Sequence, residues 1–400
     1  MTRRGTPLEV LLVFLRLGLT SFGGPVAHLG YFRSELVERR GWIGEPAYAE
    51  IVALCQFLPG PASSQTGFAL GLLRAGPLGA LAAWVGFTVP SALFLLLCAA
   101  PSVRLAGTAA GAGLLHGLRL AAVSVVAQAV WSMARTLCPD RPRAAIALAA
   151  MILVAIVPAG VGQLAAIALG AACGILADRS NVVLEDATAL PSPVSPPAAG
   201  FCLALFTALL VLPAALPGIS EAHPALALAA AFYRAGALVF GGGHVVLPLL
   251  HDAVVAPGWV TEDRFLAGYG LAQAVPGPLF SVAAFLGAVA RPGPGGAAGA
   301  AIGLVAIFLP GLLLLGTLPF WSWLRQRRAA RAGLRGANAA VVGLLAMALY
   351  DPLWTGTVLR PADFIAALTG FLLLVLWRFP PLAVVTLGAV AGVTLGVLRP

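Results

Sequence analysis

The sequence predicts an all-α polytopic membrane protein made of two inverted-topology repeats, each with a helical segment broken by Pro-Gly-Pro. Three observations lead to this fold class: the composition, an internal repeat and the placement of the arginines. Of the 400 residues, 60% are hydrophobic and only 10% are charged. Because a soluble domain carries about 25% charged residues, lipid must cover much of the surface of this chain.

An internal repeat divides the chain into two halves. Residues 14–25 (FLRLGLTSFGGP) align with residues 232–243 (FYRAGALVFGGG), with a matched arginine and a matched Phe-Gly-Gly. Further along, Gln-x-x-Pro-Gly-Pro occurs at 56–61 and again at 273–278. Chance does not produce such a series twice in one order, so we infer two homologous halves.

A polar, proline-rich stretch at 178–197 separates the halves and predicts an exposed linker. We therefore expect three parts in the chain. They are a first repeat at 1–178, a linker with a connecting transmembrane span at 179–222, and a second repeat at 223–400.

Each half is predicted to contain the same series of helices. A first apolar helix ends in a glycine cluster, an amphipathic stretch follows, and the next hydrophobic segment is broken by Pro-Gly-Pro. Four continuous apolar spans complete the half. The expected ranges in the first half are 8–22, 46–74 (broken), 77–100, 109–133, 143–158 and 160–177. Those in the second half are 225–240, 263–291 (broken), 296–320, 335–351, 361–379 and 381–398, and a span at 200–217 connects the halves.

Parity and charge both predict that the second half is inverted. Each half has two interrupted segments, the first apolar helix and the Pro-Gly-Pro segment, and four continuous ones. The two interrupted segments contribute an even number of crossings whether they cross the membrane or re-enter it, so each half with the connecting span gives an odd total. The arginines at 325–335 mark a cytoplasmic loop by the positive-inside rule, whereas the matching loop at 100–108 holds only Arg104. We therefore expect a cytoplasmic N-terminus and a periplasmic or extracellular C-terminus.

The first Pro-Gly-Pro break is the predicted anion-binding element. A break in mid-membrane frees backbone N–H and C=O groups, and the helix that restarts after it directs its positive dipole end at the break. The candidate binding residues of this copy are Pro59, Gly60, Pro61, Ser63, Ser64 and Gln65. The second copy keeps Gly277 but continues with Leu279 and Phe280, so it is less polar. The alternative is that Pro-Gly-Pro only kinks a packed helix.

Two arginines inside predicted membrane helices, Arg16 and Arg234, occupy equivalent positions of the two halves. A charged side chain at mid-bilayer costs at least about 2.5 kcal/mol, so it normally faces a cavity or a partner. The planar guanidinium fork also matches tetrahedral oxyanions. Both arginines are therefore candidate substrate contacts, and the alternative is that they snorkel to the membrane interface.

Other residues near the breaks are further candidates for substrate binding. Glycine runs allow positive φ or close backbone approach, or pack helix against helix. Histidines there titrate near neutral pH or hydrogen-bond a free carbonyl, and the equivalent glutamines line the break or cap its carbonyls. The candidates are Gly23, Gly24, His28, Gln56, Gly241, Gly242, His244 and Gln273. Glu50 is interpreted either as a carrier of a coupling proton or as a solvated first-turn carboxylate.

The composition also limits the chemistry. The five cysteines stand singly, without a CxxC pair or a His-rich tract, so we expect no metal and no cofactor. No lysine occurs in the sequence, which forbids a GxxxxGK[ST] phosphate loop. We therefore expect energy from an ion gradient, the membrane potential or anion exchange.

These motifs resemble the chromate transporter family in its long-chain form with two fused domains. The resemblance rests on Phe22-Gly-Gly-Pro25 with His28, the first Gln-x-x-Pro-Gly-Pro with its Ser-Ser-Gln run, Phe240-Gly-Gly-Gly243 and Pro276-Gly-Pro278. It covers nearly the whole chain apart from the linker and flanking spans. It implies a multi-pass protein of the bacterial inner (plasma) membrane that exports chromate and confers chromate resistance, with sulfate as a competing or exchanged anion.

The leading hypothesis is a secondary transporter, not an enzyme, that binds a tetrahedral oxyanion between the inverted repeats. A second hypothesis is uptake or exchange of sulfate or another oxyanion by the same architecture. A third, from another class, is a membrane-embedded polyprenyl pyrophosphate phosphatase, although no second carboxylate pairs with Glu50. The expected partners are chromate or sulfate and the lipid bilayer, without nucleic acid, and a homodimer is left open.

Overall fold

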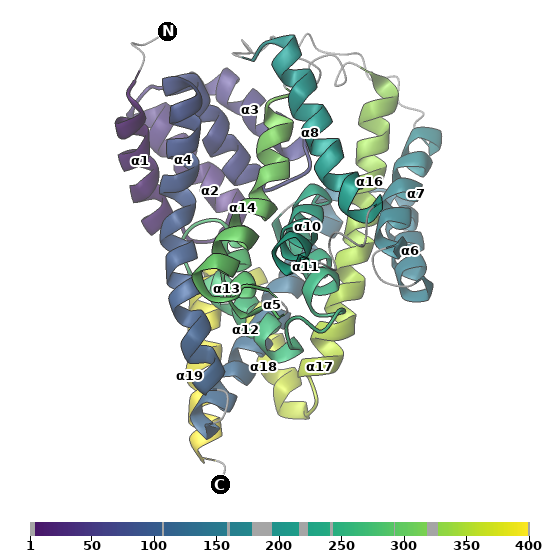
Figure 1. Cartoon of the computed structure of the whole chain (residues 1–400). Helices are drawn as coiled ribbons and strands as arrows, with labels where there is room; N and C mark the ends of the chain where they lie inside the picture. The colour runs from purple at the N-terminus through teal and green to yellow at the C-terminus, as the bar shows by residue number, and fades with distance from the viewer. Residues whose placement is uncertain are drawn as a thin grey trace.

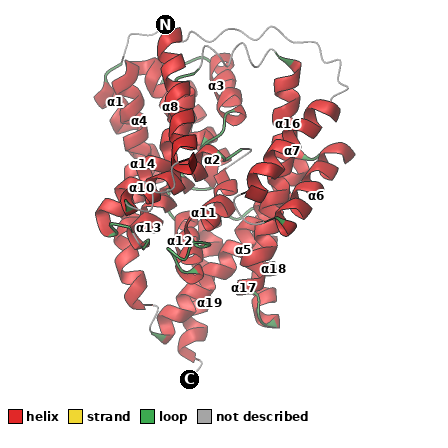
Figure 2. Ribbon diagram, turned by 45° about the vertical axis from the view of Figure 1, so that its right-hand side comes forward, coloured by secondary structure: helices red, strands yellow, loops and turns green. Residues whose placement is uncertain are grey.

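The computed structural model is a bundle of helices, and its described part contains no strand (Figure 2). It describes residues 5–105, 108–157, 161–177, 194–215, 223–240, 243–291, 293–317 and 327–398. The first helices are α1 (Pro7–Thr20), α2 (Gly24–Phe32), η1 (Arg33–Arg39), α3 (Glu45–Phe57), α4 (Ala62–Leu105), α5 (Ala109–Leu137), α6 (Arg141–Ile156) and α7 (Val161–Ala177). They are followed by α8 (Pro196–Ala215), α10 (Pro224–Ala237), η2 (Gly243–Val245), α11 (Val246–Val254), α12 (Glu262–Ala274), η3 (Leu279–Ser281), α13 (Val282–Val289), α14 (Gly296–Leu315), α16 (Arg328–Ala348), η4 (Leu349–Trp354), α17 (Thr355–Thr357), α18 (Pro361–Val375) and α19 (Pro381–Leu398).

Five of the described helices are long and apolar enough to cross a membrane. They lie at Ala62–Ala100, Ala109–Leu137, Pro196–Pro213, Gly296–Leu315 and Arg328–Thr357. The prediction of an all-α polytopic membrane protein is confirmed. Helices occupy the expected spans at 143–158 and 361–379, but they are short, with 16 residues in α6 and 15 in α18. That these two helices cross the membrane stays a prediction. Hydropathy alone does not separate a short helix from a full crossing.

Proline and capping side chains mark where helices begin. Thr6 accepts the N–H of Glu9 ahead of α1, and Asp140 accepts the N–H of Arg143 ahead of α6. Both helices also carry proline in their first turn, where its missing N–H costs nothing. These residues fix the points at which the chain turns between helices.

Each Pro-Gly-Pro segment folds back on itself as a hairpin. In the first half, the guanidinium of Arg74, beyond the break, stacks over the ring of Trp42, ahead of it, 5.1 Å from the ring centroid. In the second half, the N–H of Arg291 donates to the carbonyl of Trp259 at 2.9 Å. The two ends of each segment therefore lie together, and each segment returns to the end of the molecule from which it starts.

The returning arm of each hairpin packs tightly against the next long helix. In the first half both belong to α4, which reverses direction at Gly76, where φ is +69°. Gly71 packs there directly against the backbone of Gly79. In the second half Gly287 of α13 packs in the same way against Gly299 of α14. Small residues permit this close approach of two helices.

The long helices exchange partners between the two halves. The α5 helix packs against α18 and α19, whereas α16 packs against α6 and α7 (Figure 1). Glycines make close contacts on both sides, because Gly117 of α5 meets Gly388 of α19 and Gly336 of α16 meets Gly170 of α7. In both views α1 and α19 lie at opposite ends of the molecule.

The connecting span that the sequence predicts at 200–217 corresponds to α8, which covers Pro196–Ala215. The expected linker around it falls largely at 178–193 and 216–222, outside the described residues. The boundaries of the two repeats stay a prediction.

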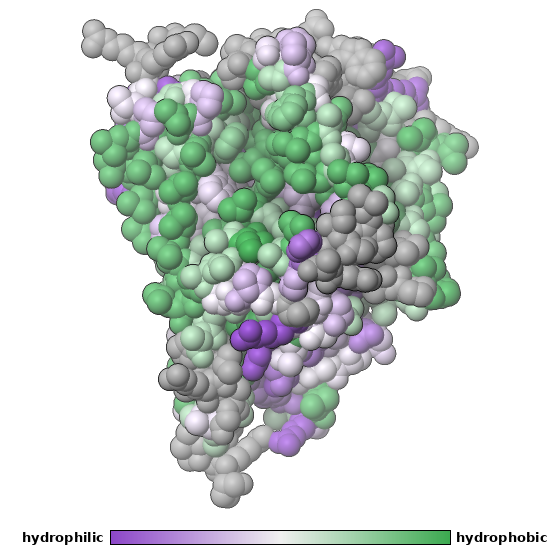
Figure 3. Space-filling model, in the orientation of Figure 1, coloured by the Kyte–Doolittle hydropathy of each residue, from purple (hydrophilic) through white to green (hydrophobic). Residues whose placement is uncertain are grey.

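The outer surface is largely apolar, as a lipid-facing surface must be. Hydrophobic residues cover much of the face shown in Figure 3. Among the most exposed are Leu97 of α4, Leu176 of α7 and Phe201 of α8, with exposed fractions of 74%, 83% and 68%. Soluble proteins rarely expose so large a continuous apolar surface to water, so this surface is expected to face lipid.

We predict that Gly117→Ala lowers the stability of the protein. An added Cβ would overlap the carbonyl oxygen of Gly388, and overpacking of this kind costs about 1–3 kcal/mol. Thermal unfolding in detergent should show a lower midpoint. Gly200→Ala in α8 is the control, because no neighbouring heavy atom lies within 4 Å of its added Cβ. Equal midpoints for the two variants would contradict the packing argument.

Candidate functional site

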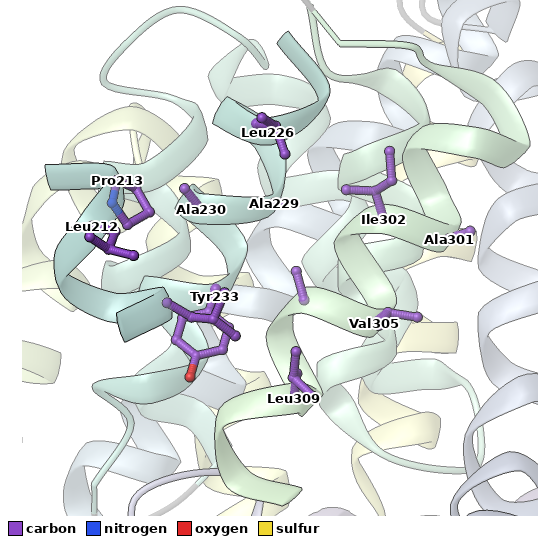
Figure 4. A pocket seen from close by; sticks show the side chains of 12 residues that line it. Leu212, Pro213, Leu226, Ala229, Ala230, Tyr233, Ala301, Ile302, Val305 and Leu309 are labelled. Atoms are coloured by element: carbon purple, nitrogen blue, oxygen red, sulfur yellow. The ribbon is translucent and has the colours of Figure 1, made fainter. Parts of the chain in front are cut away.

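The hollow between α8, α10 and α14 has no charged group among its described lining residues. It holds about 630 Å³ and is lined by apolar side chains such as Leu226 and Leu309 (Figure 4). The hydroxyl of Tyr233, on the same wall, donates to the carbonyl of Phe206 at 3.1 Å. This apolar surface has almost no group that could bind an anion. The anion-binding residues predicted from the sequence lie instead at the two breaks.

The two breaks bond to each other's half of the molecule. The N–H of Gly60 donates to the carbonyl of Val239 at 2.8 Å, and the N–H of Gly277 donates to the carbonyl of Ser21 at 3.0 Å. Ser21, after α1, aligns with Val239, after α10. Gly60 of the first break likewise aligns with Gly277 of the second, so the two hydrogen bonds are equivalent. The exchanged bonds satisfy backbone groups that have no water to bond within a bilayer.

Glycine is required at the centre of each break. The φ angles of Gly60 and Gly277 are +122° and +102°, a region that L side chains rarely adopt. A Cβ added at Gly60 would lie 3.0 Å from Cα of Gly311. One added at Gly277 would lie 2.9 Å from Oγ of Ser91. Conformation and space therefore both exclude a side chain.

Gln65 ties the first break to the second half. It is fully buried in the first turn of α4, and its side-chain nitrogen donates to the carbonyls of Pro59 at 3.0 Å and Gly311 at 3.1 Å. Because both neighbours are acceptors, the amide orientation is fixed by chemistry. Gln65 therefore braces the break through its amide nitrogen. Its role as an anion-binding residue stays a prediction.

Buried polar side chains of the first half gather around the two breaks. They come from the end of α1, from α2 and from two places on α4, and none is more than 3% exposed. They are Ser21, His28, Ser63, Ser64, Gln65, Thr66, Thr88 and Ser91. Thr66 and Ser91 donate to carbonyls of their own helix. We call Ser21, His28, Ser63, Ser64 and Thr88 the serine–histidine cluster.

Four members of the serine–histidine cluster hold a polar atom that has no hydrogen-bond partner among the described residues. These atoms are Oγ of Ser21, Nε2 of His28, Oγ of Ser64 and Oγ1 of Thr88. The other ring nitrogen of His28, Nδ1, lies 3.4 Å from Oγ of Ser63, and the ring packs edge-on against Phe87. Since buried polar groups are normally hydrogen-bonded, this arrangement is ready to bond a polar ligand.

The second half carries no matching polar set. The residues aligned with the cluster are Val239, Val246, Phe280, Ser281 and Phe308. Only Ser281 is polar, and its hydroxyl already donates to the carbonyl of Pro278 at 2.5 Å. The two breaks therefore share a backbone geometry but differ in chemistry.

The two glycine loops also lie against each other. Gly23 and Gly24 have φ angles of +99° and +78°. A Cβ added at Gly243 of the second half would lie 3.1 Å from Cγ of Pro25 in the first. Three further candidates in the second loop, Gly241, Gly242 and the side chain of His244, lie outside the described residues.

Three of the predicted substrate contacts do not lie with the cluster. Arg16, Arg234 and Gln56 are exposed. Arg16 shares the exposed face of α1 with Leu12 and Leu19. The structure therefore does not bring these side chains to the buried polar groups.

The two remaining candidates, Glu50 on α3 and Gln273 on α12, are half-buried, and each interacts with other protein groups. Gln273 is hydrogen-bonded to the side chain of Tyr269. A coupling role for Glu50 stays a prediction. In the described part of the chain no group of three or more His, Cys, Asp or Glu side chains could hold a metal ion.

Sequence reasoning missed Ser21, Thr88 and Ser91. Ser21 directly precedes Phe-Gly-Gly and aligns with Val239, while Thr88 lies in the Phe-Thr-Val-Pro stretch that matches Ile-Phe-Leu-Pro in the second half. The signal in the sequence that could have identified them is a polar residue of the first half aligned with an apolar residue of the second. Comparing the polarity of every aligned pair, instead of the shared motifs alone, finds these residues.

Comparison with known proteins agrees with the motifs. A family model described as chromate transporter matches the chain twice, at residues 8–175 and 226–393. The chain belongs to the chromate transporter family. The resemblance inferred from the motifs is thus confirmed, and the family is one of transporters rather than enzymes.

Relatives in this family match over most of their length. The chain is 32% identical over 354 residues to the chromate transport protein of Pseudomonas aeruginosa, covering 84% of this chain and 79% of the relative. It is 28% identical over 374 residues to that of Cupriavidus metallidurans, covering 92% and 87%. It is 27% identical over 347 residues to a probable chromate transport protein of Synechococcus elongatus, covering 84% and 82%. No solved structure matches the chain.

We predict that Gln65→Met destabilises the first break. The change leaves two buried carbonyls without their donor, and each unsatisfied group costs about 1–3 kcal/mol. Thermal unfolding in detergent should show a clear fall of the midpoint. Gln56→Met is the matched control, because this glutamine is exposed and its loss should stay within about 0.5 kcal/mol. A bracing role is excluded if the two variants unfold alike.

Proposed function

We propose that this chain is a secondary transporter that exports chromate across the bacterial inner membrane and thereby confers chromate resistance. Its family and the names of its relatives from Pseudomonas aeruginosa and Cupriavidus metallidurans support the substrate class. The buried polar atoms beside the first break support a binding site for an oxyanion. Membership of a transporter family favours transport over the phosphatase hypothesis.

The serine–histidine cluster is the observation that carries the proposal. Chromate is a tetrahedral dianion, which must exchange its water for protein donors in a buried site. The hydroxyls of Ser21, Ser64 and Thr88 each offer one donor, and Nε2 of His28 offers another in one tautomer. The N-terminus of the helix that begins at Ala62 adds positive potential at the same place.

Neutral donors suit a substrate that must also leave. A site of hydroxyls, one imidazole and a helix dipole attracts an anion without a permanent ion pair, so release does not require breaking one. Arg16 and Arg234 are exposed and have no contact with the substrate in this proposal. Gly60 and Gln65 hold the break in shape, and the cluster binds the anion.

We also propose that the two halves are inverted repeats with a cytoplasmic N-terminus and a periplasmic C-terminus. The matched bonds of Gly60 and Gly277 and the exchanged packing of α5 and α16 are the contacts that a pseudo-two-fold axis in the membrane plane produces. The start of α16, with Arg328 and Arg331, lies at the same end of the molecule as α1 (Figure 1). Basic residues favour the cytoplasmic side.

The membrane potential favours export of a dianion. Moving one elementary charge across the membrane is worth about 2.3 kcal/mol per 100 mV. An inside-negative potential therefore drives a doubly charged anion outward twice as strongly as a singly charged one. Alternate opening of the central site to the two sides then suffices for efflux.

Proteoliposomes preloaded with radiolabelled chromate test this function. Vesicles that contain the purified chain should release chromate faster than protein-free vesicles, and an inside-negative potential should accelerate the release. Release of labelled sulfate without chromate would support the alternative of sulfate transport. If neither anion moves, and neither competes with the other, the oxyanion proposal is wrong.

We predict that Ser64→Ala raises the KM for chromate about tenfold or more, because a hydrogen bond to a charged group contributes about 1.5–3 kcal/mol. Initial rates in proteoliposomes over a range of chromate concentrations measure the change. Ser281→Ala is the matched control at the aligned position, since its hydroxyl already bonds Pro278, and its KM should change less than about threefold. Equal effects of the two changes would contradict the proposed asymmetry.

A further inference from the structure

An ion pair occurs at the same place in both halves, with different chemistry. In the first half, Nε of Arg33 in η1 lies 2.6 Å from Oε1 of Glu45 at the start of α3. In the second half, Nε2 of His251 in α11 lies 2.8 Å from Oε2 of Glu262 at the start of α12. Arg33 aligns with His251, and Glu45 aligns with Glu262. Each pair ties the helix after the glycine loop to the first arm of the Pro-Gly-Pro hairpin.

His251 lies among carboxylates where three helices meet. Its Nδ1 is 3.7 Å from Oδ1 of Asp252, and its ring packs edge-on against Phe265 of α12, with 5.4 Å between centroids. Gln163 of α7 donates to Oδ2 of Asp252 at 2.6 Å. The contacts of this one imidazole and its neighbour therefore join α11, α12 and α7.

The charges around His251 are dominated by its two carboxylate partners. Asp252 and Glu262 are the charged groups that act on its titration. The α16 helix, which also packs against α11, carries no ionisable side chain after Arg335. The other charged or histidine side chains on α12, α5 and α10 each lie elsewhere or have another partner. They are Asp263 (paired with Arg119 of α5), Arg264, the exposed Arg234, Arg135 (over the ring of Trp131) and His116 (paired with Asp363). No described guanidinium competes with the imidazole for Glu262.

The titration of His251 follows from this geometry. Burial by itself would lower the pKa of His251, but its contacts with Asp252 and Glu262 raise that pKa to about 9, against an ordinary value of 6.5. The stabilisation that the charged ring provides is complete below the ordinary pKa and is lost as the pH rises through about 9. Arg33 keeps its charge throughout, because a guanidinium does not deprotonate in proteins.

We propose that His251, Glu262 and Asp252 form a binding site for one proton, which locks α11 to α12. With the proton bound, the imidazolium holds both carboxylates and fixes the start of α12. When the proton leaves, the neutral ring keeps a single N–H donor and no charge, so it can bond Glu262 or Asp252 but not both, and its hold on the start of α12 weakens. The Arg33–Glu45 pair is the permanently charged counterpart at the other half of the molecule.

Proton binding and the position of α12 are then thermodynamically linked. If the contact opens, the pKa of His251 returns towards 6.5, so opening releases a proton at any pH between that value and about 9. Closing takes the proton up again. A difference in pH across the membrane therefore biases this contact according to the side that it faces, whichever anion the protein carries.

Hydrogen–deuterium exchange of the purified full-length protein in detergent tests the site. Amides at 262–268 should exchange about tenfold faster at about pH 10 than at about pH 7, after correction for the intrinsic rate. His251→Arg should abolish this difference, because it copies the permanently charged pair of the first half. His251→Gln should show rapid exchange at both pH values.

Arg33→His is the reciprocal variant and keeps the test decisive if a change at His251 prevents folding, as judged by gel filtration. It should give amides at 45–51 a pH-dependent exchange that the wild-type protein lacks there. The proposal is overturned if wild-type exchange at 262–268 shows no pH response beyond the intrinsic rate. It is equally overturned if wild-type protein and His251→Gln respond alike.

Discussion

Two hydrogen bonds, from Gly60 to Val239 and from Gly277 to Ser21, are the constraint on which the rest of the structure depends. A helix that breaks inside a bilayer exposes peptide groups that lipid cannot satisfy. Here each half supplies the acceptor that the break of the other half requires. The positive φ of both glycines and the bracing by Gln65 follow from that exchange, because the two hairpin tips must approach backbone to backbone.

Duplicated geometry leaves the chemistry of each half free to differ. The first half buries hydroxyls and an imidazole near the breaks, while Phe280 and Phe308 occupy aligned positions in the second half. The same division recurs nearer the outer ends of the hairpins, where Arg33 in one half corresponds to His251 in the other. At each of these two places, one half has a purely structural arrangement. The other half has the polar or titratable side chains that could bind an anion or a proton.

Much of this architecture could be predicted from the sequence, because the repeat of Gln-x-x-Pro-Gly-Pro and the apolar composition are visible without a structure. The exposed position of Arg16 could not, since a helix of this hydrophobicity does not reveal which face packs against protein. Ser21 and Thr88 were missed because the residues aligned with them in the second half are apolar, and a comparison of shared motifs does not mark such a difference. The partnership of His251 with Glu262 depends on how a loop folds, and hydropathy does not record that.

The exchanged packing of α5 and α16 affects how the protein is made. Gly117 leaves the ribosome long before Gly388, its neighbour in the folded chain. At about 5–20 residues per second, α5 waits tens of seconds in the membrane with its glycine face uncovered. During that time the helix must be kept from pairing with the wrong neighbour. A half-length chain of this type would cover the same face only by assembling with a second polypeptide.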